Sequence, residues 1–129
     1  MERQGDPWRH AAVIESEIRR LFIAAATKQF PQRVRLYTRN VGVFRLNGDR
    51  YFRAGIKGQA DVTGYYRTEG GPRPIEVELK MPRGTMSPEQ EAWRTLCEEW
   101  GVTYLLLTVQ KDEADPIPRF VGQLGAAIS

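Results

Sequence analysis

The strict alternation of charged and apolar side chains over residues 74–81 constrains the fold more than any other feature of the chain. Three charged residues alternate there with three apolar ones, Glu76, Glu78 and Lys80 with Val77, Leu79 and Met81. Because successive side chains of a β-strand point to opposite faces of a sheet, the pattern predicts a strand with one apolar and one charged face. The charged face has two interpretations: the solvated side of an edge strand, or a metal site with its own lysine.

The first half of the chain is predicted to form one helix followed by short strands. Apolar residues recur at three- and four-residue spacing over residues 8–29, which predicts an amphipathic helix that Pro31 stops. The strands expected next are 33–38, 42–46 and 50–54, and the Asn-Gly pair in residues 47–50 is typical of a hairpin turn. A second hairpin is expected from the strands 60–68 and 74–81, with the turn at 69–73 between them.

The second half of the chain is predicted to add a helix, a strand and a short C-terminal helix. Ser87 is a good N-cap, Pro88 suits the first helical position and Gln90 completes a capping box, so a helix begins here and Gly101 ends it. Residues 102–109 are continuously apolar, which predicts a central strand. The expected fold is a single α/β domain over residues 1–129, with a mixed β-sheet flanked by helices.

The composition limits which kinds of site are possible. Of the 129 residues, 41% are apolar, which suits one domain with a hydrophobic core. A single cysteine and a single histidine exclude cysteine-based zinc clusters and histidine-rich metal sites, so any metal must have oxygen ligands, as Mg²⁺ and Mn²⁺ prefer. Apolar runs stay well below the roughly 18 residues of a membrane span, and we expect a cytoplasmic protein with no membrane partner.

Charge is distributed unevenly along the chain. Residues 28–57 contain eight lysines and arginines and one acid, whereas residues 76–99 contain six acids and three basic residues. A basic surface beside an acidic centre suggests an anionic polymer held next to a cation-dependent site. The alternative is a solvated surface with uneven charge.

Carboxylates and a lysine are expected to meet where the second hairpin ends. Its turn lets the two arms lie side by side, so that Asp61 can lie next to Glu78. Two carboxylates this close repel each other unless a divalent cation lies between them, and the backbone carbonyl of Leu79 would be a third oxygen ligand. Lys80, on the same face as Glu78, is placed to hold or polarise an attacking water.

Residues from three other segments are expected near this point. Gln90, in the first turn of its helix, can reach the same region, and Glu15 lies at the edge of the apolar stripe of the first helix. Arg83 follows Lys80 in a loop where a strand to be cut would pass. Against an enzyme acting on small phosphates, no glycine-rich phosphate loop opens a helix.

This order of residues resembles that of the PD-(D/E)xK nucleases, in which a helical acid precedes a second acid and an ExK motif at the end of the next strand. The more specific resemblance is to the VRR-NUC (virus-type replication-repair nuclease) domain, from about residue 13 to 109. It is carried by "ESEIRR", "RNVGVFR", "GIKGQADVTG", "IEVELKMPRGTMSPEQEAW" and "GVTYLLL". Ala60 stands where the motif has a proline.

The resemblance implies a restriction-endonuclease-like core and an endonuclease that uses Mg²⁺ or Mn²⁺. By this resemblance Asp61 and Glu78 are the metal-binding pair, with the Leu79 carbonyl as a further ligand. Lys80 is the catalytic lysine and Gln90 the trailing glutamine. Two assignments stay open. The helical acid is Glu15, which reaches the metal directly or through water, or else Glu17, and Glu76 offers a second register for the ExK motif.

The chain resembles the compact stand-alone members of this family. These come mostly from phages and bacteria and look like homodimers that act on branched DNA such as Holliday junctions. We therefore expect a homodimeric, structure-selective endonuclease in the cytoplasm of a bacterial or phage-infected cell. The candidate dimer surfaces are the hairpin within residues 33–52, which is preferred, and the apolar tail of residues 119–128. The alternatives are a flap or single-strand nuclease and an inactive nucleic-acid-binding protein on a nuclease fold. The residues expected to contact DNA are Arg39, Asn40, Arg53, Lys57 and Arg83.

Overall fold

The computed structural model describes residues 7–39, 42–45 and 48–129, and for residues 7–13, 42–45 and 52–54 it describes the backbone alone. Three helices and six strands are described in these ranges. They are α1 (Pro7–Gln29), β1 (Val34–Thr38), β2 (Gly42–Arg45), β3 (Tyr51–Ala54), β4 (Val62–Thr68), β5 (Gly71–Lys80), α2 (Pro88–Glu99), β6 (Thr103–Thr108) and α3 (Ile117–Ala127). No helix in the described ranges is long and apolar enough to cross a membrane.

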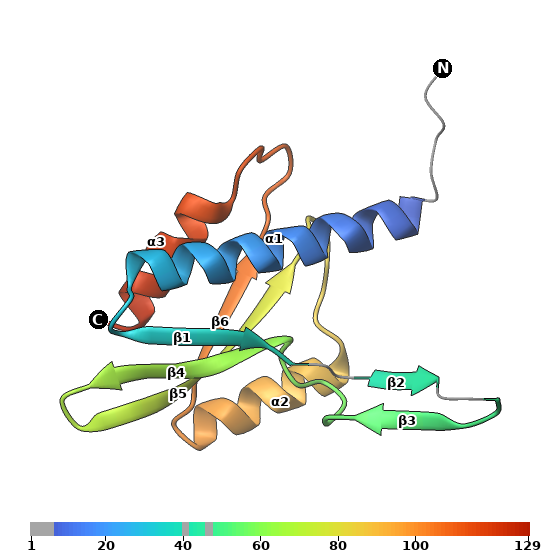
Figure 1. The fold of residues 1–129 in the computed structure, drawn as a ribbon, viewed down its shortest axis with the longest axis horizontal. Coiled ribbons are helices and arrows are strands. Elements are labelled where there is room, and N and C mark those ends of the chain that lie inside the picture. The colour runs from blue at the N-terminus through green and yellow to red at the C-terminus, as the bar shows by residue number, and fades with distance from the viewer. Residues whose placement is uncertain (1–6, 40–41, 46–47) are drawn as a thin grey trace.

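Four of the strands form one mixed sheet in the order β1-β4-β5-β6 (Figure 1). β4 pairs antiparallel with both β1 and β5, whereas β5 and β6 run parallel. The predicted hairpin of residues 60–81 is confirmed, with Val62 opposite Val77, although β5 begins at Gly71 rather than at residue 74. The expected α/β class with a mixed sheet is therefore confirmed.

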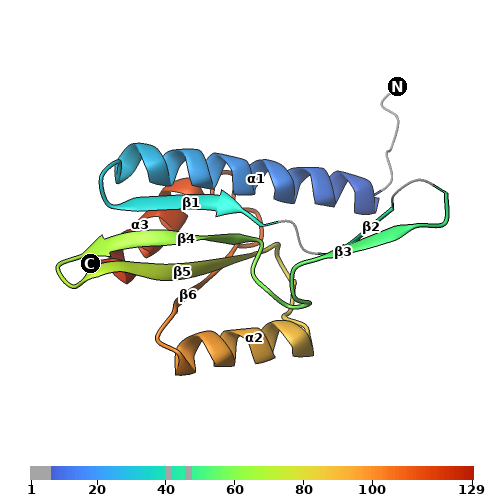
Figure 2. The same ribbon diagram turned by 60° about the horizontal axis from the view of Figure 1, so that its bottom comes forward.

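β2 and β3 form a separate two-stranded antiparallel sheet that extends beyond the end of the main sheet (Figures 1 and 2). Phe44 is opposite Phe52 in this pair, so the predicted hairpin between these two strands is confirmed. β1, however, pairs with β4 in the main sheet. The segment 33–52 proposed as one dimer surface is thus divided between two sheets.

Helices cover both faces of the main sheet (Figure 2). α1 and α3 pack against each other on one face, where the rings of Phe22 and Phe120 meet edge to face at 6.2 Å between centroids. The apolar core lies on this side and includes Val77 and Leu79 of β5, which confirms the predicted apolar face of that strand. α2 lies on the opposite face (Figure 2), where its Trp93 donates a hydrogen bond to Glu76 of β5.

β6 is an edge strand of the sheet, so the prediction that residues 102–109 form a central strand is wrong. Both α2 and α3 contact β6, and Leu107 is fully buried. A strand covered by helices on both faces needs apolar side chains on both faces, whether or not a further strand pairs with its free edge. The continuous apolar run therefore indicates that both faces of β6 are covered by helices. It does not indicate whether β6 lies at the edge or in the centre of the sheet.

The charged face of β5 is buried beneath α2 and is not a solvated surface. Glu76 and Glu78 are 3% and 2% exposed, and β5 has a neighbouring strand on each side. Ionised carboxylates are very costly to bury unless hydrogen bonds or opposite charges compensate them. The interpretation as a solvated edge strand is excluded, and the partners of the two carboxylates need to be identified.

Candidate active site

Asp61 and Glu78 lie at the same end of the β4–β5 hairpin. The register pairs Val62 with Val77, so Asp61, one residue before β4, lies opposite Glu78. The Cβ atoms of directly opposed residues in an antiparallel pair are about 5 Å apart. The backbone also fixes this corner, because Arg39 N donates to the carbonyl oxygen of Asp61 at 2.6 Å.

The environment of Glu78 opposes its ionisation. Burial, followed by the negative charge of Asp61, raises the pKa of Glu78 to about 7 from its ordinary 4.5, although the Lys80 ammonium acts in the opposite direction. Its Oε2 atom is buried and has no hydrogen-bond partner among the described residues. The neighbouring residues therefore leave part of the negative charge at this corner unbalanced, and they leave one hydrogen-bond acceptor without a partner.

Lys80 and Gln90 form a hydrogen-bonded chain with Glu78. Lys80 Nζ donates to Gln90 Oε1 at 2.7 Å, and Gln90 Nε2 donates to Glu78 Oε1 at 3.1 Å. The distance from Lys80 Nζ to Glu78 Oε1 is 3.6 Å, an ion pair with both side chains largely buried. Three residues predicted for the site are therefore in contact, with Asp61 opposite one of them.

The predicted capping box of α2 sets the position of Gln90. Gln90 N donates to Ser87 Oγ at 3.1 Å, and Ser87 N donates back to Gln90 Oε1 at 2.9 Å. The glycine-rich loop before β4 packs against the same turn, because a Cβ atom on Gly58 would lie 2.3 Å from the carbonyl oxygen of Glu89. Gln90 Oε1 thus accepts from both the helix N-terminus and Lys80, so its capping role and its site contact coexist.

Glu15 reaches this corner through Arg19, which the sequence pattern did not predict as a site residue. Arg19 Nη2 is 3.1 Å from Asp61 Oδ2 and 3.7 Å from Glu15 Oε1. Glu17, the alternative acid, pairs with Arg20 on the exposed side of α1. The four-residue spacing of Glu15 and Arg19 places both on one side of the helix, and this was the available signal for Arg19.

Glu76 has a separate set of partners. Its Oε1 atom accepts from Arg39 Nη1 at 2.6 Å and from Trp93 Nε1 at 2.9 Å. Glu78, two residues further on, is the glutamate in contact with Lys80 and Gln90. The geometry therefore favours the register with Glu78 in the site and gives Glu76 a role in attaching α2 and the end of β1 to the sheet.

The predicted DNA-contact residues have different surroundings. Arg39 is in an ion pair of 2.6 Å with Glu76, and its contact with DNA stays a prediction. Lys57 is exposed and forms a surface ion pair of 3.3 Å with Glu89. Arg83 is exposed in the loop after β5 and has a positive φ of 67°. Asn40 and the side chain of Arg53 lie outside the described residues.

The carboxylate oxygens at this corner supply only part of the coordination that a hard divalent cation needs. Asp61 and Glu78 supply carboxylate oxygens, and the unpartnered Glu78 Oε2 is a vacant acceptor beside Asp61. Within the described ranges, no group of three or more His, Cys, Asp or Glu side chains is arranged to hold a metal. A cation here would need backbone or solvent oxygens besides these two, for which the Leu79 carbonyl stays a prediction.

Comparison with protein-family models, with curated proteins and with solved structures finds no match for this chain.

Proposed function

We propose that this protein is a metal-dependent DNA endonuclease with a restriction-endonuclease-like core. The observation that carries the proposal is the chain of contacts Lys80–Gln90–Glu78 with Asp61 opposite Glu78. A lysine and two carboxylates from neighbouring strand ends are the groups needed for metal-assisted hydrolysis of a phosphodiester. The resemblance of "GQAD", "ExK-x-P-x-G" and "S-x-x-Q-x-x-W" to VRR-NUC nucleases supports the same reaction.

Each residue of the site has a defined part in this proposal. Asp61 and Glu78 would hold Mg²⁺ or Mn²⁺, with the Leu79 carbonyl as a third protein ligand. When bound, the cation lowers the pKa of a water and offsets negative charge on the phosphate. Lys80 orients the nucleophilic water and adds positive charge where negative charge develops. Gln90 holds the Lys80 ammonium in place, and Glu15 acts through Arg19 on Asp61.

The substrate proposed is DNA, preferentially branched. The basic excess of residues 28–57 provides attraction to phosphates that does not depend on base sequence. A homodimer would present two centres to a two-fold symmetric junction, and the β2–β3 sheet beyond the main sheet is the preferred dimer surface. Light scattering at micromolar concentration tests the dimer, because a monomer mass would remove this part of the proposal.

The test of the reaction is cleavage of a fluorescent four-way junction and of linear duplex in Mg²⁺, in Mn²⁺ and in EDTA. The wild type should cut in either metal and not in EDTA. Lys80→Ala and Asp61→Asn should lower the rate at least about 100-fold while DNA affinity stays within about three-fold. Lys111→Ala, an exposed lysine without a partner in the described chain, is the matched control and should cut normally.

Two other outcomes have defined meanings. DNA binding without cleavage in any metal would favour an inactive nucleic-acid-binding protein on a nuclease fold. Cleavage of flaps or single strands but not of junctions would favour the flap or single-strand nuclease. Wild-type turnover of Lys80→Ala would show that the active site is misassigned.

A further inference from the structure

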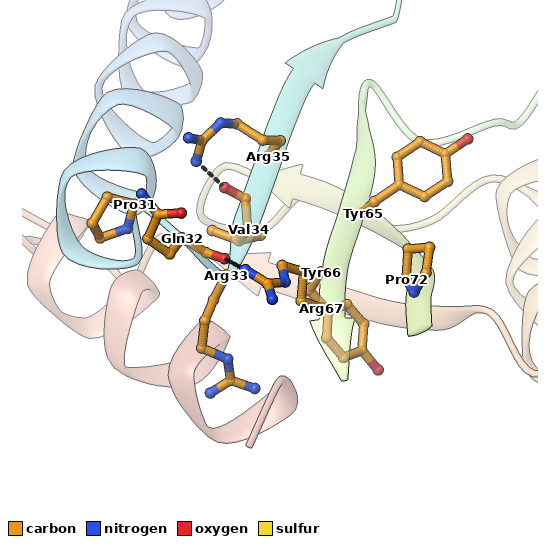
Figure 3. A pocket seen from close by; sticks show the side chains of 9 residues that line it. All are labelled: Pro31, Gln32, Arg33, Val34, Arg35, Tyr65, Tyr66, Arg67 and Pro72. Carbon is orange, nitrogen blue, oxygen red and sulfur yellow. Dashed lines mark hydrogen bonds between the residues drawn. The ribbon is translucent and has the colours of Figure 1, made fainter. Parts of the chain in front are cut away.

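A groove of about 370 Å³ lies at the opposite end of the β1–β4 pair from the candidate active site (Figure 3). Residues 31–35 form one side of it, and Tyr65, Tyr66 and Arg67 of β4 with Pro72 form the rest. Figure 3 shows Arg33 and Arg35 on the β1 side and Arg67 on β4. The groove is thus lined by three arginines and two tyrosines and contains no acidic residue.

Five of the eight other arginines whose side chains are described form ion pairs with carboxylates, and these three do not. Their guanidinium groups donate to backbone carbonyls, Arg33 to Ile128, Arg35 to Val34 and Arg67 to Gln32. Among the described residues, none of the three forms an ion pair. A guanidinium has five N–H donors, so each retains donors for an incoming anion.

Tyr65 supplies an exposed aromatic face beside these charges. Its side chain is 54% exposed, and it lies directly opposite Arg35 in the β1–β4 ladder. Tyr66, the next residue, is buried and its hydroxyl is bonded to Thr103, so only one of the two rings is available. On the edge strand, Tyr37 is also half exposed and follows Arg35 by two residues, on the same face.

The groove and the candidate active site share one face of the sheet. Thr63, Tyr65 and Arg67 of β4 alternate on one side of the sheet, and Thr63 lies opposite Glu76 of β5, so Glu76 and Glu78 share that side. Asp61 and Tyr65 are four residues apart, which corresponds to about 13 Å of extended chain. A strand that crosses this face would extend from the candidate site to Tyr65 over about four phosphate spacings of a stacked chain.

We propose that this face is a platform for an unpaired nucleic-acid strand, in which Arg35 and Arg67 contact phosphates and Tyr65 stacks on a base. Proteins that bind single strands combine a basic track with exposed aromatic rings, because every base has a face that can stack. A paired base cannot stack on Tyr65, so the aromatic face favours an unpaired strand over a duplex. The inference rests on the proposed function only for the identity of the polymer.

The test is fluorescence anisotropy in EDTA with a labelled 12-nucleotide DNA and its duplex, so that no cleavage is needed. Tyr65→Ala should weaken binding of the single strand about ten-fold or more, whereas Tyr65→Phe, which keeps the ring, should stay within two-fold. Arg35→Ala/Arg67→Ala should weaken binding and flatten its salt dependence by one to two units. Lys111→Ala, beyond β6 and away from the groove, should change neither quantity.

A second measurement uses the unmodified protein and does not depend on how the variants fold. A 12-nucleotide DNA that carries 5-iodouracil should cross-link on irradiation to the peptide that contains Tyr65. Unchanged single-strand affinity of Tyr65→Ala, equal weakening on duplex and single strand, or a cross-link elsewhere would each overturn the platform. Binding without cleavage would contradict the nuclease proposal alone, and absence of all nucleic-acid binding would contradict both.

Discussion

Arg19 of α1 donates a hydrogen bond of 3.1 Å to Asp61, which precedes β4 by one residue. This contact joins the helix that carries Glu15 to the end of the hairpin that carries Glu78. It also places the positively charged guanidinium of Arg19 next to Asp61, one of the two proposed metal-binding carboxylates. The Oε2 atom of Glu78, the other carboxylate, has no hydrogen-bond partner among the described residues. The charge at this corner is therefore only partly balanced by the protein itself.

Arg19→Met should make the protein more dependent on a divalent cation for its stability. Without the guanidinium, the repulsion between Asp61 and Glu78 is less compensated, so the variant should unfold at a lower temperature in EDTA. Adding Mn²⁺ should raise its melting temperature by more than it raises that of the wild type. Arg20→Met, on the exposed side of α1, is the matched control. Equal Mn²⁺ shifts in Arg19→Met and wild type would contradict this account.

Gln90→Ala should separate the capping role of Gln90 from its role in the site. Losing half of the capping box should cost about 1 kcal/mol of unfolding free energy, as should Ser87→Ala, which removes the other half. Only Gln90→Ala also removes the contacts with Lys80 and Glu78, so only it should lower cleavage strongly, by about ten-fold or more. Urea unfolding and cleavage rates measure the two effects, and similar rates in both variants would show that Gln90 acts only as a cap.

Stability without metal should fall as pH rises through the titration of Glu78. The pKa of Glu78 is raised by burial and by Asp61 to about 7 from 4.5, so the folded state holds this proton more tightly than the unfolded state. The contribution is favourable at low pH and is lost between about pH 4.5 and 7, by at most about 3 kcal/mol. Urea unfolding in EDTA at pH 5 and pH 8 should show this loss in the wild type but not in Glu78→Gln. An equal pH dependence in the two proteins would rule it out.

Glu76→Gln should reduce stability without reducing the cleavage rate per folded molecule. The amide keeps the size of the carboxylate but removes its negative charge. That charge compensates the guanidinium of Arg39 and strengthens the hydrogen bond that Trp93 donates. We expect a loss of about 2 kcal/mol in unfolding free energy, typical of a disrupted, largely buried charged hydrogen bond. Glu98→Gln, in an exposed i,i+4 pair with Arg94, should cost under about 0.5 kcal/mol. A cleavage defect in Glu76→Gln as large as that of Glu78→Gln would instead shift the ExK motif to the other register.

Local sequence determined most of the secondary structure, because its signals act over a few residues. The apolar stripe of α1, the antiparallel pairing of β2 with β3 and the capping box of Ser87 and Gln90 each depend on neighbours in the chain. The alternation in β5 likewise predicted that Val77 and Leu79 face the core. It also predicted that Glu78 and Lys80 share a face, which the 3.6 Å ion pair agrees with.

The tertiary structure alone decided what covers each face and which distant charges meet. Alternation shows which side chains of a strand point the same way, but not whether helix or solvent lies above them, so the burial of Glu76 and Glu78 under α2 was not predictable. The apolar run of β6 reflects coverage by α2 and α3 on both faces, and this is equally compatible with an edge and a central strand. The contact of Arg19 with Asp61 spans 42 residues, and it depends on how α1 lies across the sheet. Such pairings follow from the packing of whole elements, which no local pattern in the sequence encodes.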